Sequence, residues 1–309
     1  MMKKIKKNYK MTIAYDGGGY KGWQRLTNEP GTIQGTIERV LSKIEGSPVK
    51  ISGSGRTDAG VHAKGQVAHA FLKTNEDPEL LRQELNRMLP EDIRICLVES
   101  VSQSFHSRYS AVSKVYEYRI DQRSRADVFT RKYCYHRPVH LDLDRMRQAA
   151  DHLTGTHDFG SFTDNKEADS VRTIFSIDMK EENEKLVLAF RGDGFLYHMV
   201  RILAGTLLEV GEGSRTPESV LEAFHHRDRS LTGFLAPAHG LCLREVNYKY
   251  KILFIKITEE IMRRWINEIY FMECQWDTCL CPKRVFRLFQ GSRCGYFLYT
   301  RKQDAGRSA

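Results

Sequence analysis

Apolar residues recur along the chain with two different periods, and these predict strands and helices. Over residues 10–15 they fall at every second position, which is typical of a half-buried strand. Over residues 32–45 they fall at every third or fourth position, which is typical of an amphipathic helix that Gly46 ends. The same two periods predict strands over residues 67–71 and 93–101, and a helix that begins at Asp77-Pro78 and ends before Pro90.

A second group of elements follows with a similar order, although no repeat of residues relates it to the first. We expect strands over residues 115–120, 173–179, 186–191 and 241–248, and helices over residues 143–153, 196–210 and 217–224. Strand, helix, strand, strand, helix, strand is the order of a ferredoxin-like module. The sequence therefore predicts an α+β fold with two such modules, residues 1–110 and 111–250. Their antiparallel or mixed sheets would lie side by side, with an active-site cleft between them.

Composition and charge narrow the class of protein. With 309 residues, 41% hydrophobic and 28% charged, the chain suits a soluble protein of two domains. It has no run of the roughly 20 apolar residues that a membrane helix needs. The basic start of the chain leads into no apolar signal sequence, so we expect a cytoplasmic protein. The net charge of +9 suits a nucleic-acid partner.

Residues 251–309 differ from the rest of the chain. They hold 11 Lys and Arg against 6 Asp and Glu, a net charge of +5. Residues 258–272 could form an amphipathic helix, and a cysteine-rich basic stretch follows. Its cysteine spacing admits a zinc site only weakly, because it is not a pair of C-x2-C motifs. A poorly ordered appendage, an added RNA contact and a fused foreign segment all remain open. The four cysteines are Cys274, Cys279, Cys281 and Cys294.

The most informative segment is the glycine-rich run over residues 53–69. It places one carboxylate, Asp58, in a loop of small residues, two positions after Arg56. The arginine is always charged, so it could keep Asp58 ionised and also reach a phosphate. A carboxylate beside a site for a polyanion is unfavourable and therefore suggests a chemical use. The alternative is a solvated turn in which the two side chains merely pair.

Three further segments carry candidate functional residues. Residues 15–25 place Trp23 between Lys21 and Arg25, which suits base stacking and phosphate contact as well as a plain glycine turn. Residues 105–118 contain Arg108 and then two tyrosines on one face of a strand, Tyr116 and Tyr118. Residues 195–205 place Arg201 among apolar residues, where a buried arginine needs a carboxylate partner. We expect that partner to be Asp58, and we expect His198 to be a core histidine.

Together these four segments resemble the signatures of the TruA family of tRNA pseudouridine synthases, and the likeness runs from about residue 10 to residue 248. The resemblance implies that Asp58 is catalytic and that Tyr116 and Arg201 are active-site residues. It leaves Tyr118 structural. One departure is Glu117, where the family commonly has a basic residue. Candidate contacts to RNA are Lys21, Trp23, Arg25, Arg56 and Arg108.

The resemblance also implies a reaction, a substrate and partners. The expected activity is isomerisation of uridine to pseudouridine at about positions 38, 39 and 40 of the tRNA anticodon arm, by a homodimer. Neither a cofactor nor a metal is needed. Asp58 would act at the ribose, either as a nucleophile at C1′ or as a base at C2′, and Tyr116 would remove the C5 proton. Two alternatives stay open: an RNA-binding protein that has lost catalysis, and the same chemistry at a different uridine.

Overall fold

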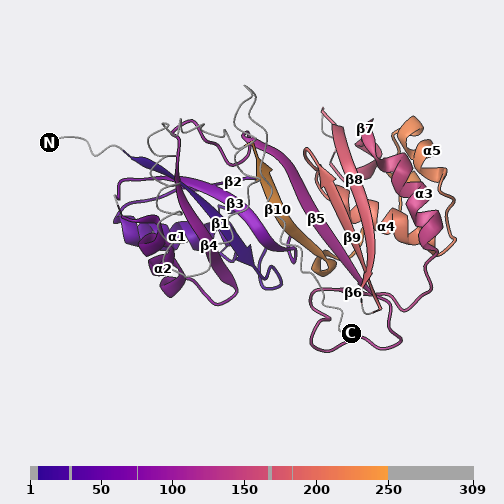
Figure 1. Ribbon diagram of the computed structural model, residues 1–309, viewed down its shortest axis with the longest axis horizontal. Helices are drawn as coiled ribbons and strands as arrows, with labels where there is room; N and C mark the ends of the chain where they lie inside the picture. The colour runs from indigo at the N-terminus through magenta and orange to yellow at the C-terminus, as the bar shows by residue number, and fades with distance from the viewer. Residues whose placement is uncertain (1–5, 28–29, 75, 166–168, 183, 250–309) are drawn as a thin grey trace, which may run out of the picture. The chain divides into compact units, whose positions relative to one another are not determined.

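A ten-stranded sheet runs through the part of the chain that the computed structural model describes, residues 6–27, 30–74, 76–165, 169–182 and 184–249. Its main path is β4-β1-β3-β10-β5-β9-β8-β7, with β2 beside β3 and β6 beside β5 (Figure 1). Only the ladders β3–β10 and β5–β6 are parallel among the described strands. The predicted α+β class with antiparallel or mixed sheets is therefore confirmed.

The elements follow one another as the hydrophobic periods predict, with short strands added. The strands are β1 (Lys7–Tyr15), β2 (Ser52–Gly53), β3 (His62–Leu72), β4 (Ile93–Val101), β5 (Ala111–Asp121), β6 (Tyr135–His136), β7 (Gly155–Asp158), β8 (Val171–Glu182), β9 (Lys185–Gly192) and β10 (Leu241–Tyr248). The helices are α1 (Ile33–Glu45), α2 (Pro78–Met88), α3 (Leu143–Leu153), α4 (Met199–Gly211) and α5 (Ser219–His226). The sequence did not predict β2, β6 and β7, because two to four residues are too few to show a period.

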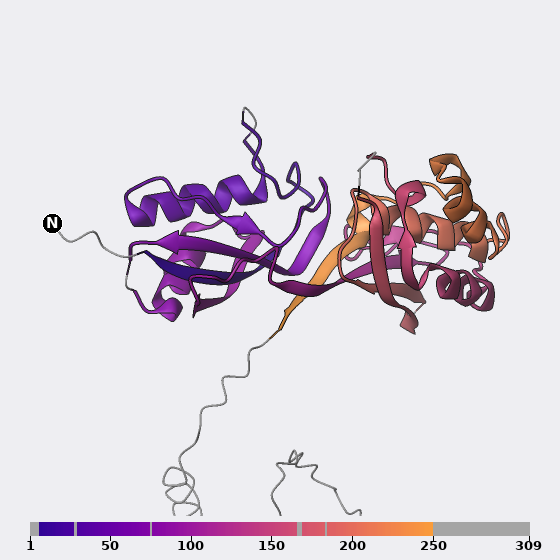
Figure 2. The same cartoon turned by 90° about the horizontal axis from the view of Figure 1, so that it is seen from above.

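Each half of the sheet has the strand order of a ferredoxin-like module. If the short strands β6 and β7 are left out and the others are numbered along the chain within each half, both halves have the order 4-1-3-2. These are β4-β1-β3-β2 and β10-β5-β9-β8. The halves join where β10 runs parallel to β3, with Cys242 opposite His62 and Leu243 opposite Ala63. In Figure 2, β10 (orange) lies between the half that carries α1 and α2 and the half that carries α3, α4 and α5. We propose that the two halves correspond to two modules, residues 1–110 and 111–250.

Capping residues explain where several helices begin and end. Thr32 accepts a hydrogen bond from the backbone of Gly35 at the start of α1, and Gly46 ends that helix with φ of +66°. Asp77 caps α2, whose first residue is Pro78. These boundaries agree with the sequence predictions within about one residue.

Helix α4 begins later than predicted and is the most buried helix of the described chain. The hydrophobic run suggested a start at residue 196, but His198 has φ of +63° and the helix begins after it. Eleven of the 13 residues of α4 are buried. The segment 229–236 packs closely on this helix: a Cβ on Gly205 would overlap the backbone of Phe234.

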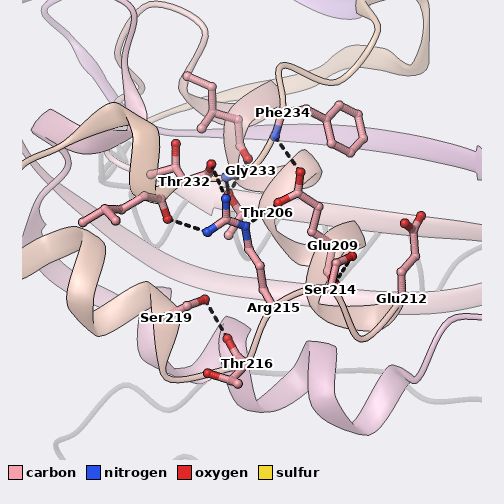
Figure 3. A network of polar contacts seen from close by, with 12 residues as sticks. Thr206, Glu209, Glu212, Ser214, Arg215, Thr216, Ser219, Thr232, Gly233 and Phe234 are labelled. Carbon is pink, nitrogen blue, oxygen red and sulfur yellow. Dashed lines mark hydrogen bonds and ion pairs between the residues drawn. The ribbon is translucent and has the colours of Figure 1, made fainter.

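A polar network fastens that segment to α4 (Figure 3). Arg215 donates hydrogen bonds to the carbonyl oxygens of Leu231 (2.8 Å) and Thr232 (2.9 Å), and it also pairs with Glu209. Glu209 in turn accepts from the backbone N–H of Phe234 at 3.2 Å. The helix and the segment therefore form one supported unit.

Candidate active site

The loop that carries Asp58 connects β2 to β3 and rests on the residue 15–25 segment. The backbone N–H of Trp23 donates to the carbonyl oxygen of Thr57 at 3.0 Å, and the hydroxyl groups of Tyr15 and Thr57 lie 2.8 Å apart. Gly22 has φ of +89°, and a Cβ there would lie 2.7 Å from the Thr57 oxygen. Only glycine suits that position. The first signature segment is thus a support for the Asp58 loop.

Asp58 lies close to two basic side chains from the other half of the chain, Arg201 and His198. Its Oδ2 atom lies 3.1 Å from Nη1 of Arg201 and 3.6 Å from Nε2 of His198. Nε of Arg201 donates to the carbonyl oxygen of Ala236 at 2.7 Å, which fixes the guanidinium. The predicted pairing of Arg201 with Asp58 is confirmed. Within the described residues no partner contacts Oδ1, so this oxygen remains available to a substrate.

Arg56 does not hold Asp58 as the sequence suggested. It is exposed, and its Nε donates to Oε1 of Gln24 at 3.0 Å. In the described part of the chain no ion pair joins it to Asp58. Arg56 remains a candidate RNA contact.

Tyr116 lies on β5 and lines the same cavity as Asp58. Its ring is 7% exposed and meets Phe195 edge to face, with centroids 5.3 Å apart. Burial, the neighbouring Tyr15 and the negative charge of Asp58 all raise the pKa of the Tyr116 phenol. Tyr118 is fully buried and donates to the carbonyl oxygen of Pro237 at 3.0 Å, so its predicted structural role is confirmed.

The candidate RNA contacts fare differently. Trp23 is only 2% exposed and packs beside Tyr15, so the prediction that it stacks on a base is wrong: a ring enclosed by its own core offers no face. Arg25 pairs with the buried Glu38 at 3.0 Å, although half of its side chain is exposed. Lys21 and Arg108 are exposed.

The departure at Glu117 has a structural explanation. Glu117 alternates with Tyr116 along β5 and so lies on the other face of the sheet. Its carboxylate pairs with Arg119 at 2.8 Å and with Arg244 at 3.6 Å. The substitution therefore leaves the chemistry of the cavity untouched.

A cavity of about 520 Å³ surrounds Asp58 and is lined by residues of both halves of the sheet. Among the described lining residues Asp58 is the only acid. Such a surplus of positive charge favours a polyanionic ligand. The lining cations are Arg56, Arg108, Lys114, Arg172 and Arg201.

Sequence reasoning missed the role of Lys114 and misjudged His198. Lys114 lies two residues before Tyr116 on the same strand, so the period of two could have placed both side chains on one face. Its Nζ donates to the carbonyl oxygen of Ser54 in the Asp58 loop at 2.8 Å. His198 is not a core histidine: it is half-buried in the wall of the cavity, because its backbone turns it toward Asp58 and Asp164.

Neither a metal centre nor a membrane span is visible in the described residues. In those ranges no group of three or more His, Cys, Asp and Glu is placed to hold a metal ion. No helix there is both long and apolar enough to cross a bilayer. The predicted helix over residues 258–272 and the four cysteines of the possible zinc site lie outside the described residues.

Comparisons with known proteins identify the family of the chain. A family model described as tRNA pseudouridine synthase matches residues 11–110 and 149–249, which include Asp58 and Arg201. A protein of Bacillus sp. (strain KSM-64) named tRNA pseudouridine synthase A is 46% identical over 243 residues, 78% of this chain and 99% of that protein. A protein of Geobacillus sp. (strain WCH70) with the same name is 45% identical over 249 residues, 79% of this chain and 99% of that protein. On this match, the chain belongs to the tRNA pseudouridine synthase family.

Proposed function

We propose that this protein isomerises uridine to pseudouridine in tRNA, at about positions 38, 39 and 40 of the anticodon arm. The proposal rests on the contacts that the two carboxylate oxygens of Asp58 make. Arg201 holds one carboxylate oxygen at 3.1 Å, and the other oxygen has no partner among the described residues. A carboxylate so placed, in a cavity where the charged lining residues other than Asp58 are cations, suits chemistry on a bound polyanion. The substrate follows from the family, and the positions follow from the resemblance of the four segments.

The reaction breaks the bond between N1 of uracil and C1′ of ribose and forms a bond between C5 and C1′. The proton on C5 leaves, and N1 gains one, so there is no net oxidation, reduction or hydrolysis. The base must leave its stack before a side chain reaches C1′, which costs a few kcal/mol. The four lining cations other than Arg201 would bind the phosphates on either side of the extruded nucleotide.

Asp58 would act through Oδ1. This oxygen either attacks C1′ and expels N1, or takes the C2′ proton to leave a glycal; both routes return Asp58 to its ionised form at the end. Arg201 contacts Oδ2 in the resting site and stabilises the ionised carboxylate from which either route starts. Asp58 must therefore be both ionised and correctly oriented for either route.

Tyr116 would pack against the uracil and remove the C5 proton. Because burial and the charge of Asp58 raise its pKa, the phenol is protonated in the resting site and serves first as a packing surface. When Asp58 has bonded to C1′ or has taken a proton, its negative charge is gone. One cause of the raised pKa then disappears, so the phenol gives up its proton more readily to the detached N1 of uracil. The phenolate that remains takes the proton from C5 and becomes a phenol again, so that N1 gains the proton that C5 loses.

The resemblance also supports a cytoplasmic homodimer in which two subunits share one tRNA. Two copies would double the number of cationic surfaces that face the nucleic acid. Sedimentation of the protein with and without tRNA tests this: a complex of two chains and one tRNA is expected, and a protein that sediments as a single chain in both cases contradicts the homodimer.

Tritium release tests the reaction and Asp58 together. The substrate is unmodified tRNA with 5-³H-uridine, which loses its label when C5 bonds to ribose. We expect release by the wild type, none by Asp58→Ala or Asp58→Asn, and tRNA binding by all three. Release by the variants would remove Asp58 from its role. Binding without release by the wild type would favour an RNA-binding protein that has lost catalysis.

A further inference from the structure

His198 stands at an unusual turn directly before α4. Its φ of +63° lies in the left-handed region, which residues other than glycine rarely adopt and which often marks functional sites. Its carbonyl oxygen accepts hydrogen bonds from the backbone N–H groups of Arg201 (3.0 Å) and Ile202 (3.1 Å). The turn therefore sets both the direction of the imidazole and the start of the helix that carries Arg201.

The imidazole is held from one side, and its other nitrogen faces Asp58. Its Nδ1 lies 2.6 Å from Oδ2 of Asp164, and the ring stacks on Tyr197 with centroids 3.7 Å apart. The other ring nitrogen, Nε2, lies 3.6 Å from Oδ2 of Asp58. The arrangement is a carboxylate, an imidazole and a second carboxylate in a row.

Asp164 is itself anchored by the segment that anchors Arg201. Nε of Arg229 donates to Oδ1 of Asp164 at 2.9 Å, and Nη1 of Arg229 donates to the carbonyl oxygen of Gly233 at 2.9 Å. Ala236, three residues further on, accepts the hydrogen bond from Arg201. The network of Figure 3 fastens this same segment to α4. One segment, residues 229–236, thus supports both side chains that contact Asp58.

We propose that His198, oriented by Asp164, is a positioning residue for Asp58. The inference rests on the proposed function. Arg201 and His198 approach the same oxygen, Oδ2, from two side chains, so the carboxylate cannot rotate without losing one of them. Oδ1 is then kept toward the ribose. With Arg201 alone the carboxylate can turn about its terminal bond, and misplacement of a reacting atom by 1 Å can cost about a hundredfold in rate.

The test is His198→Asn, measured under single turnover with the protein in excess over 5-³H-uridine tRNA. Asparagine is among the residues that best tolerate positive φ, and its amide can still donate to Asp164, but nothing replaces Nε2. We expect the rate of tritium release to fall about 10- to 100-fold, as for other residues that orient a reacting group. The Kd for tRNA and the melting temperature should stay near wild type. A merely structural histidine would instead change those two quantities.

Asp164 completes the test through a double-mutant cycle. We expect Asp164→Asn to lower the rate about 3- to 10-fold in the wild type and not at all in the His198→Asn background, since it acts through the imidazole. Asp144→Asn, at an exposed ion pair with Arg147 on α3, is the matched control and should be silent. A wild-type rate for His198→Asn, or an equal effect of Asp164→Asn in both backgrounds, overturns the inference. Absence of release by the wild type overturns the proposed function instead.

Discussion

The two halves of the sheet share one strand order and differ in everything that concerns the site. In the first half the connection between the second and third strands, β2 and β3, is the eight-residue loop 54–61 that carries Asp58. In the second half the corresponding hairpin leaves only two residues between β8 and β9. The long connection can approach a ligand, whereas a connection of two residues can do little more than join the strands.

The helix that follows the third strand differs in the opposite way. In the first half this helix is α2, an amphipathic helix that buries Leu81 and Leu85. In the second half it is α4, which is buried along almost its whole length and carries Arg201 near its start. The first half thus supplies the long loop of the site, and the second half supplies the buried helix. Neither half holds the site alone, because the ion pair of Asp58 with Arg201 crosses between them.

The largest expected effect comes from the arginine that links the halves. Arg201→Lys keeps a positive charge, but one ammonium group cannot reproduce the two directions in which the guanidinium donates, to Ala236 and to Asp58. We expect the single-turnover rate to fall about 100- to 1000-fold, the scale of losing one oriented electrostatic contact. Affinity for tRNA should change little.

A matched arginine within one half gives the control. Arg137 pairs with Glu212 through two hydrogen bonds of 2.7 and 2.8 Å and is not among the residues that line the cavity. Arg137→Lys should therefore leave the rate within twofold of wild type and lower stability by about 1 kcal/mol or less. Equal losses of rate for both variants would mean that the cross-half pair has no special role.

Two glycines in the first half, Gly22 and Gly46, differ in whether they lie against the Asp58 loop. Both Gly22 and Gly46 have positive φ, so alanine at either costs about 1–2 kcal/mol of stability through the backbone. Only Gly22 lies against the Asp58 loop, where a Cβ would be 2.7 Å from the Thr57 oxygen; nothing lies within 4 Å at Gly46. We expect Gly22→Ala to lower the rate about 10- to 100-fold and Gly46→Ala to leave it unchanged, as measured by tritium release beside thermal melts. If Gly22→Ala loses stability but not rate, the first signature does not position Asp58.

Much of the fold could be predicted from the sequence, because long periodic segments decide their own structure. The helix over residues 33–45 and the strand over residues 93–101 needed only period and caps. The strand order did not follow, since the ladder between β3 and β10 joins residues about 180 positions apart through two pairs. The apolar run before α4 was also misleading: hydrophobicity continues through Leu196, but the backbone of His198 interrupts the helix.

In the site, too, some contacts could be predicted from the sequence and others could not. The partner of Arg201 could be predicted, because a largely buried guanidinium requires a carboxylate and the sequence offers a conspicuous one. Trp23 could not be placed, since an aromatic residue beside cations suits a core and an RNA surface equally well. The role of Asp164 could not be predicted from the sequence, because it depends on a contact with His198, 34 residues later. The direction of the His198 side chain is set by a positive φ that no sequence pattern reveals.

The smallest expected effect concerns Lys114, a second link between the halves, whose ammonium group contacts Ser54 in the Asp58 loop. Burial, helped by the charges of Arg108 and Arg172, lowers its pKa from 10.5 to about 8. As the pH rises through 8 the folded protein loses this charge while the unfolded chain keeps it to about 10.5, so stability from this group rises over that window.

Affinity for tRNA should move in the opposite direction, because the cavity loses a cation. We expect the Kd of the wild type for tRNA to rise several-fold between pH 7 and pH 9 at fixed salt. Lys114→Met should bind more weakly at pH 7 and lose this dependence, with a salt slope smaller by about 1. Lys114→Arg stays charged across the range and controls for packing. An identical pH dependence in the wild type and Lys114→Met would show that the cavity binds tRNA without this side chain, and that Lys114 serves only to hold β5 against the Asp58 loop.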